Sequence, residues 1–369
     1  MKYHDPVKKI LSQMRPYWDR DQTRPAVRHA FGKALQCRTA ELGAEVYASE
    51  NQDLILYHTC KSRSCSSCGH RASVQWLRER WAALPDVSYK GITLTMPKEF
   101  WLLFRDNPCL ARALPALAAA VIQAHSNAKY GLRVGIIAIL HTFNPKLDFN
   151  SHVHTMVTGG GLCASPGKWI DHVYYDRNAL MEAWKTAVIC LLRAALHSDQ
   201  LHAKTSGDKM EELLMDQGKR WWSIKFQSFE SKAHFLQYAG RYVRRPPIAQ
   251  RRITHMGERT VTFWAKDKKL HRRVYVTCSL EEFVDRLAQH IPERYQHAVR
   301  SFGLFAPRAL SQTSGSVLAI LGQERRPRPK PRRWADSIKR DFGRDPLLDP
   351  TGKKMKWVGQ LPAKARGRN

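Results

Sequence analysis

The chain has 369 residues, 43% of them hydrophobic, and its 61 Lys and Arg against 32 Asp and Glu give a net charge of +29. This is too apolar for a disordered chain, no run reaches the ~18 uninterrupted apolar residues of a membrane span, and residues 1–20 lack the apolar stretch of a secretory signal. We therefore expect an intracellular protein of two or three domains that does not contact a membrane. Its strongly positive charge predicts a polyanionic partner.

The first 85 residues are rich in His, Cys and Arg and end in a helical pattern over residues 71–84. Three of the eight cysteines, Cys60, Cys65 and Cys68, fall within nine positions. Eight cysteines are too few for a disulfide framework in a chain of this length, so the cluster predicts a metal site. We interpret this part as a small module organised by zinc.

The remaining chain alternates between strand and helix patterns. Hydrophobic periodicity predicts strands at 91–96, 134–143, 152–158, 260–264 and 273–277. It predicts helices at 110–128, 177–196 and 231–243, and another that opens at the capping box beginning with Ser279. From residue 323 onward the chain is rich in Pro, Arg and Lys, which predicts an extended basic tail.

Two histidines alternate with apolar residues in the strand at 152–158. His152 and His154 project from one face about 7 Å apart, at ~3.3 Å per residue, and two imidazoles at this separation can converge on one divalent cation. A useful site needs a third ligand. His141, at the end of the preceding strand, is the preferred candidate, and His234 and Gln237 on the later helix compete with it.

Two tyrosines lie one turn apart in the helix at 231–243. Tyr238 and Tyr242 share a face, and Arg241, Arg244 and Arg245 surround them. A phenol is a poor nucleophile because its pKa is near ~10. Attack on a phosphodiester becomes feasible when a metal ion neutralises the phosphate oxygens and arginines favour the phenolate. The resulting phosphotyrosine ester conserves the bond energy, so rejoining needs no nucleotide triphosphate, and the sequence contains no Walker-type phosphate loop.

These motifs, in this order, resemble the HUH endonucleases, and in particular the two-tyrosine rolling-circle transposases of the insertion sequence 91 family. Residues 141–161 are similar to that family's metal segment, residues 37–43 and 58–68 to its amino-terminal zinc module, and residues 290–305 to its closing segment. The resemblance extends from about residue 25 to 310.

The resemblance implies an α+β fold in three parts. Residues 1–85 would form a zinc-binding module that contacts DNA, and residues 86–310 an HUH nuclease domain with a central antiparallel sheet flanked by helices. Residues 311–369 would form the basic extended tail.

The resemblance also implies roles for the site residues. His152 and His154, with His141, would hold Mg²⁺ or Mn²⁺, while Tyr238 and Tyr242 would attack single-stranded DNA at the ends of a mobile element. The expected protein is thus a transposase that acts through 5′-phosphotyrosine intermediates, in the prokaryotic cytoplasm and associated with the nucleoid. The alternatives are a plasmid or phage rolling-circle replication initiator, and a catalytically inactive zinc-containing DNA-binding protein.

The zinc module departs from the family pattern. Cys60, Cys65 and Cys68 can hold one zinc tetrahedrally with a fourth ligand, which is either Cys37 or a histidine (His29, His58 or His70). Residues 48–51 stand where the family carries a further Cys-x-x-Cys, and residues 349–355 look like a zinc ribbon without its cysteines. A second zinc is therefore not expected.

Several aromatic residues lie among lysines and arginines, namely Trp221, Trp222, Trp264 and Tyr275. They either stack on exposed bases, as in proteins that bind single strands, or belong to the core. We favour the core for most of them. The choice of DNA over RNA rests on the family resemblance.

Overall fold

The computed structural model describes residues 5–62, 64–66, 68–163, 167–243, 246–267 and 270–364, without the side chains of residues 70 and 310–314. The helices are α1 (Pro6–Gln13), α2 (Arg15–Trp18), α3 (Pro25–Gln36), α4 (Gly69–Ala83), α5 (Trp101–Asp106), α6 (Pro108–Tyr130), α7 (Arg177–His197), α8 (Gly207–Lys219), α9 (Lys232–Ala239), α10 (Leu280–Ala288), α11 (Pro307–Ile320) and α12 (Trp334–Phe342), with short 3₁₀ turns η1 (Ala40–Leu42), η2 (Lys98–Phe100) and η3 (Gln250–Arg252). The strands are β1 (Ala44–Ala48), β2 (Asp53–Tyr57), β3 (Tyr89–Leu94), β4 (Leu132–Arg133), β5 (Gly135–Phe143), β6 (Phe149–Thr158), β7 (Gly161–Cys163), β8 (Trp169–Ile170), β9 (Ile224–Phe229), β10 (Ile253–Met256), β11 (Thr260–Lys266), β12 (Arg273–Ser279), β13 (Val299–Gly303) and β14 (Lys356–Leu361).

The chain forms two compact units, and each is assembled from segments that are distant in sequence. The first unit comprises Met1–Trp76, Arg244–Ile291 and Pro329–Asn369, and the second comprises Leu77–Val243 and Pro292–Arg328. The domain boundaries near residues 85 and 310 stay a prediction. The α+β fold class, with a cysteine cluster in the amino-terminal part and an antiparallel sheet beyond it, is confirmed.

A five-stranded sheet forms the centre of the second unit, in the order β13-β5-β6-β3-β9 with antiparallel neighbours throughout. β5 and β6 are the apolar strands that the sequence predicts, and β6 occupies the middle of the sheet. A strand in this position is paired on both edges and covered on both faces, which explains why nearly all residues of β6 are buried.

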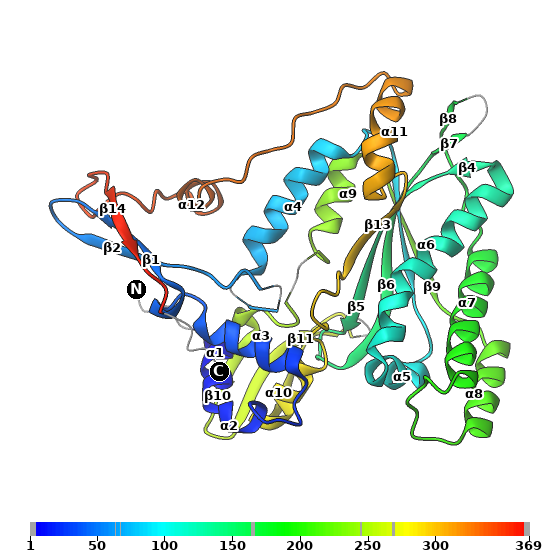
Figure 1. Cartoon of the computed structure of the whole chain (residues 1–369), viewed down its shortest axis with the longest axis horizontal. Helices are drawn as coiled ribbons and strands as arrows, with labels where there is room; N and C mark the ends of the chain where they lie inside the picture. The colour runs from blue at the N-terminus through cyan, green and yellow to red at the C-terminus, as the bar shows by residue number, and fades with distance from the viewer. Residues whose placement is uncertain are drawn as a thin grey trace. The chain divides into compact units, whose positions relative to one another are not determined.

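Helices cover both faces of this sheet. Figure 1 shows α6, α7 and α8 on one side, where Leu114, Val153 and Trp184 belong to a single hydrophobic core, and α9 on the other. α6 is long and apolar enough to cross a membrane, by length and composition only, and 44% of its most apolar window is buried. Because α6 packs against β5 and α7, we interpret it as a core helix.

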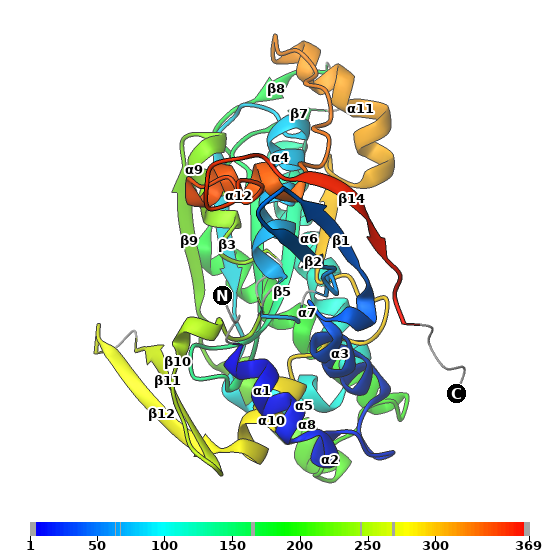
Figure 2. The same cartoon turned by 90° about the vertical axis from the view of Figure 1, so that its left-hand side faces the viewer.

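The first unit combines short helices with two three-stranded sheets. Helices α1, α3 and α10 supply buried apolar residues, among them Ile10, Phe31 and Phe283. Figure 2 shows β11 between β10 and β12, and Ser279 caps α10 as the capping box predicts, since its hydroxyl accepts from the Glu282 amide at 3.1 Å. In the other sheet β1 lies between β2 and β14.

Two predicted elements differ in the structure. The prediction of a fully extended tail over 311–369 is wrong, because α11 continues to Ile320, α12 follows, and β14 pairs antiparallel with β1 from the other end of the chain. This segment has few apolar side chains, and those that it buries contact residues far away in sequence. Its local composition therefore did not reveal these elements.

The helix predicted to reach residue 243 ends as an α-helix at Ala239. The chain then tightens, because the Arg241 and Tyr242 amides donate to carbonyls three residues earlier, each at 3.0 Å. Gly240 stands at this transition, where a Cβ atom would lie 3.0 Å from a methyl group of Leu77. A larger residue would therefore require the Leu77 side chain to shift by a few tenths of an ångström.

Candidate active site and zinc centre

Strand pairing brings three histidines together on one face of the central sheet. His141 on β5 lies directly opposite His152 on β6, and His154 follows two residues later on the same face. The imidazole centroids are 4.9–5.5 Å apart, and one ligand atom of each residue lies within 4.8 Å of the others. His141 and His154 are buried and His152 is partly exposed. The arrangement therefore suits a metal ion that is reached from one side.

Neighbouring groups orient two of the three imidazoles. His154 Nδ1 is hydrogen-bonded to the Thr93 hydroxyl on β3 at 3.0 Å, and His152 Nδ1 donates to the Asn150 carbonyl at 2.8 Å. Second partners of this kind hold the ring and its tautomer in place in metal sites. Both rings would then ligate a cation through Nε2. Thr93 lies within a predicted strand, but nothing in the sequence places it beside His154, which is its partner across β3 and β6.

Tyr242 is the tyrosine that touches the histidines. Its ring centroid lies 4.0 Å from that of His154 and 5.3 Å from that of His141. Its backbone carbonyl accepts a hydrogen bond from His141 Nε2 at 3.1 Å. The turn after α9 thus attaches the tyrosine segment to the histidine cluster by both its side chain and its main chain.

Tyr238 lies one turn earlier, with its ring 4.8 Å from Tyr242 and 5.0 Å from Phe229. The Tyr238 ring packs over Gly91 on β3, where a Cβ atom would lie 3.5 Å from it, an ordinary van der Waals distance. Burial is the largest cause that raises the pKa of Tyr238, and the hydrogen bond and negative charge of Tyr242 raise it further.

Of the three arginines predicted around the tyrosines, the structure describes Arg241. Arg241 is exposed and lowers the pKa of Tyr238, as does a hydrogen bond from Thr93, but burial outweighs both. Arg244 and Arg245 lie outside the described residues. A phenolate at Tyr238 would therefore need positive charge beyond that of Arg241. His234 and Gln237, the competing ligand candidates, are exposed, and it is His141 that joins the described histidine cluster.

Four cysteines of the first unit form a second cluster. Cys37, at the end of α3, joins Cys60, Cys65 and Cys68, and their sulfur atoms all lie within 4.8 Å of one another. Cys68 Sγ is 3.5 Å from Cys37 Sγ and 3.6 Å from Cys60 Sγ. A tetrahedral zinc with Zn–S bonds of ~2.3 Å requires sulfurs about 3.8 Å apart, so the cluster fits structural zinc.

The position of Cys37 in this cluster favours a thiol as the fourth zinc ligand. Of the alternatives, His58 lies beside Glu45 at 3.8 Å, and the His70 side chain is outside the described part of the structure. Hydrogen bonds from Cys37 and Cys60 lower the pKa of Cys65 to about 7, which favours the thiolate that binds metal.

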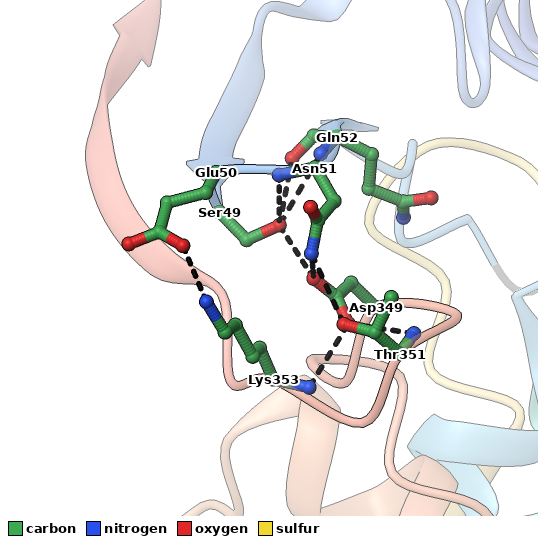
Figure 3. A network of polar contacts seen from close by, with 7 residues as sticks. All are labelled: Ser49, Glu50, Asn51, Gln52, Asp349, Thr351 and Lys353. Carbon is green, nitrogen blue, oxygen red and sulfur yellow. Dashed lines mark hydrogen bonds and ion pairs between the residues drawn. The ribbon is translucent and has the colours of Figure 1, made fainter.

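The residues that replace the missing cysteines form a polar network in the same unit. The turn between β1 and β2 meets the loop before β14, and Asp349 lies at the centre of their contact (Figure 3). One carboxylate oxygen accepts from the Ser49 hydroxyl at 2.8 Å and from Asn51 Nδ2 at 2.9 Å. The other accepts from the amides of Thr351 and Lys353, each at 2.9 Å.

This network explains how the departure from the family pattern is accommodated. An ion pair between Glu50 and Lys353 also joins the two loops. Asp349 is 5% exposed, and hydrogen bonds from Asn51 and Thr351 are the main cause that lowers its pKa. A buried carboxylate that accepts several hydrogen bonds links the two loops.

Comparisons with known proteins agree with both parts of the site. Residues 9–96 match a family model described as "Transposase zinc-binding domain", and residues 135–313 match one described as "Putative transposase". The first range includes all four cysteines of the zinc cluster, and the second includes all three histidines and both tyrosines.

Two curated proteins are similar over most of the chain. The transposase for insertion sequence element IS801 of Pseudomonas savastanoi pv. phaseolicola is 31% identical over 300 residues, which cover 78% of this chain and 72% of the relative. The protein named "Putative transposase y4qJ" of Sinorhizobium fredii (strain NBRC 101917 / NGR234) is 26% identical over 302 residues, covering 78% and 76%. No solved structure gives a significant match. On these matches, and with structural zinc in its cysteine cluster, the chain belongs to the insertion sequence 91 (IS91) family of transposases.

Proposed function

We propose that this transposase nicks and rejoins single-stranded DNA at the ends of its element through 5′-phosphotyrosine intermediates, in a rolling-circle type of transposition. The reaction would take place in the cytoplasm, at the nucleoid where the element lies. The observation that carries the proposal is the position of Tyr242, whose ring lies 4.0 Å from His154 within a cluster of three histidines.

The three histidines are the proposed ligands of a divalent cation, Mn²⁺ or Mg²⁺. Their ligand atoms lie within 4.8 Å of one another, which is compatible with one shared ion. Three imidazoles and no carboxylate in this cluster favour Mn²⁺ over Mg²⁺, since Mg²⁺ prefers oxygen ligands. A cation held there supplies charge neutralisation to the phosphate oxygens of the scissile bond.

We assign the first attack to Tyr242. Its phenol oxygen forms a bond to the phosphorus, and the bond from phosphorus to the 3′ oxygen breaks. The net reaction transfers the phenolic proton to that departing oxygen. The products are a 5′-phosphotyrosine and a free 3′-OH. The described ring contacts of Tyr238 are with Phe229 and Tyr242, so Tyr238 stands one turn farther from the histidines.

Tyr238 would then serve a second transfer. Two nucleophiles one helical turn apart let one strand end stay covalently attached while another is cut. Rejoining is the reverse reaction, in which a 3′-OH attacks the phosphotyrosine and the phenol leaves. Since the ester keeps the energy of the phosphodiester, this cycle uses no nucleotide triphosphate.

A covalent adduct tests the proposal. Purified protein is incubated with a labelled single-stranded oligonucleotide of the element's end and with Mn²⁺ or Mg²⁺, and the adduct is resolved on a denaturing gel. We expect Tyr242→Phe to abolish the first adduct and Tyr238→Phe to retain it while blocking strand joining. Tyr130→Phe, an α6 tyrosine whose hydroxyl donates to the Tyr174 carbonyl, is the matched control. DNA binding by the wild-type protein without any adduct would refute the proposal and support an inactive DNA-binding module.

A further inference from the structure

The sheet β10-β11-β12 of the first unit has one packed and one exposed face. Along β11, Val261, Phe263 and Ala265 are buried, and the Phe263 ring lies 5.9 Å from Phe283 on α10. The residues between them point to the other face, because strand side chains alternate. This outer face is therefore a surface of the unit, whereas the inner face is its core.

An aromatic pair occupies the outer face. Trp264 on β11 lies directly opposite Tyr275 on β12. The indole is held in place, since its Nε1 donates to the Arg251 carbonyl at 3.2 Å and the Arg273 guanidinium lies 4.6 Å from its ring centroid. Tyr275, by contrast, is 66% exposed, far more than a tyrosine that packs by its ring. Its exposure decides against the core role that the sequence favoured for most of these aromatic residues.

The charged residues on the three strands have one sign. The three strands contain no acidic residue, and Lys266 lies opposite Arg273 at one end of the outer face. Next to the aromatic pair, the hydroxyls of Thr262 and Thr277 are hydrogen-bonded to each other at 2.9 Å. Cations beside an exposed ring complement a polymer that carries both negative charge and flat apolar surfaces.

We propose that this outer face binds single-stranded DNA, with a base stacked on Tyr275 and with Arg273 and Lys266 against the phosphate backbone. The inference rests on the proposed function, in which the substrate is a single strand. Every base has a face that an aromatic side chain can cover, but in a duplex that face is already covered by the neighbouring pair. The surface therefore distinguishes single from double strands without reading sequence.

Equilibrium binding of labelled oligothymidine to the full-length protein tests the inference. Tyr275→Ala is expected to weaken binding about tenfold, which corresponds to the loss of one stacked base. Tyr275→Phe keeps the ring and should bind like the wild type. Tyr295→Ala is the matched control, because Tyr295 is 88% exposed and also lies beside an arginine, 5.5 Å from Arg294, but is not on this sheet. It should leave binding unchanged.

Some results would overturn the inference. These are Tyr275→Ala binding within twofold of the wild type, equal losses of affinity for oligothymidine and for a hairpin duplex, or a wild-type protein that does not bind oligothymidine. The proposed function is judged separately by the covalent adduct. If Tyr275→Ala binds like the wild type and still forms the adduct, only the stacking inference is refuted. If Tyr275→Ala binds more weakly but the wild-type protein forms no adduct, only the proposed nicking reaction is refuted.

Discussion

Two clusters of potential metal ligands can be compared, the cysteines of the first unit and the histidines of the second. They differ in how completely their side chains would surround a metal ion. The cysteine cluster has four sulfurs, enough to fill every position of a tetrahedral zinc. The histidine cluster has three imidazoles, and the centroid of the Tyr242 ring lies 4.0 Å from that of His154. A closed set of ligands leaves no place for a substrate, whereas an incomplete set leaves positions that a phosphate oxygen can take.

Zinc and the proposed histidine-bound cation are therefore expected to have separable roles. Loss of zinc should affect the fold, and loss of the histidine-bound cation should affect the reaction. The following predictions test that separation, from the largest effect to the smallest.

The largest effect is expected for the zinc ligands. Cys65→Ala should remove bound zinc and the cooperative unfolding of the first unit, since structural zinc contributes on the order of 10 kcal/mol to the folding of small domains. Cys278→Ala is the control, because Cys278 is buried in the same unit but does not belong to the cluster. Zinc content and thermal unfolding are the measurements. A Cys65→Ala protein with full zinc content would contradict a four-thiolate site.

The second largest effect is expected for a histidine of the cluster, whose loss should lower the reaction rate but not unfold the protein. His154→Ala should reduce the rate of adduct formation by at least ~10³-fold, because a ligand of the proposed cation is lost, while the melting temperature stays close to that of the wild type. His125→Ala on α6, whose ring stacks on Tyr175 5.8 Å away, is the matched control. If nicking continues at the wild-type rate, His154 does not belong to the active site.

A smaller effect is expected from the hydroxyl that holds His154. Thr93→Val removes the 3.0 Å hydrogen bond and should weaken Mn²⁺ binding by roughly 10–100-fold. Activity would be measured as a function of Mn²⁺ concentration, with recovery expected at high Mn²⁺. Thr155→Val loses a comparable bond, from its hydroxyl to the Ile92 carbonyl at 2.8 Å, and should leave the Mn²⁺ dependence unchanged. An identical Mn²⁺ response in both variants would argue against this role of Thr93.

The smallest effect is expected at Asp349. Hydrogen bonds lower the pKa of this carboxyl in the folded state, so its contribution to stability is complete above the unfolded pKa of ~3.9 and is lost as the pH falls below it. Asp349→Asn should therefore melt at a lower temperature than the wild type at pH 7. The two curves should converge as the pH falls below ~4.

The control for this prediction is Asp53→Asn, since Asp53 is an exposed aspartate on β2 of the same unit. It should melt like the wild type at pH 7. If the difference between Asp349→Asn and the wild type is independent of pH, the charge of Asp349 does not stabilise the network.

Strong periodicity and capping made much of the second unit predictable. β5, β6, α6 and α7 lie where their hydrophobic patterns indicate, because each buries an apolar face that is encoded within the element itself. β9 and β13 carry weaker patterns and were not predicted. Both lie at the edges of the central sheet, where fewer side chains are buried and the periodicity is correspondingly faint.

The predictions for the first unit were poorer for a different reason. β14 has mostly exposed side chains, and it becomes a strand because β1, more than 290 residues earlier, offers a free edge for backbone hydrogen bonds. Asp349 likewise has partners on the turn that contains Ser49 and Asn51. Contacts of this range leave no local pattern in the sequence.

The residues alone reveal the reactive side chains, namely a cluster of thiols, a pair of imidazoles and a pair of phenols, at spacings that strands and helices bring to one face. Which further side chains join them is a property of the folded chain. It brings Cys37 to the other three cysteines, places His141 against the pair on β6, and sets Tyr242 nearer to the imidazoles than Tyr238. The physical reason is that periodicity defines the face on which a side chain lies, whereas its distance from another element depends on how the two elements pack.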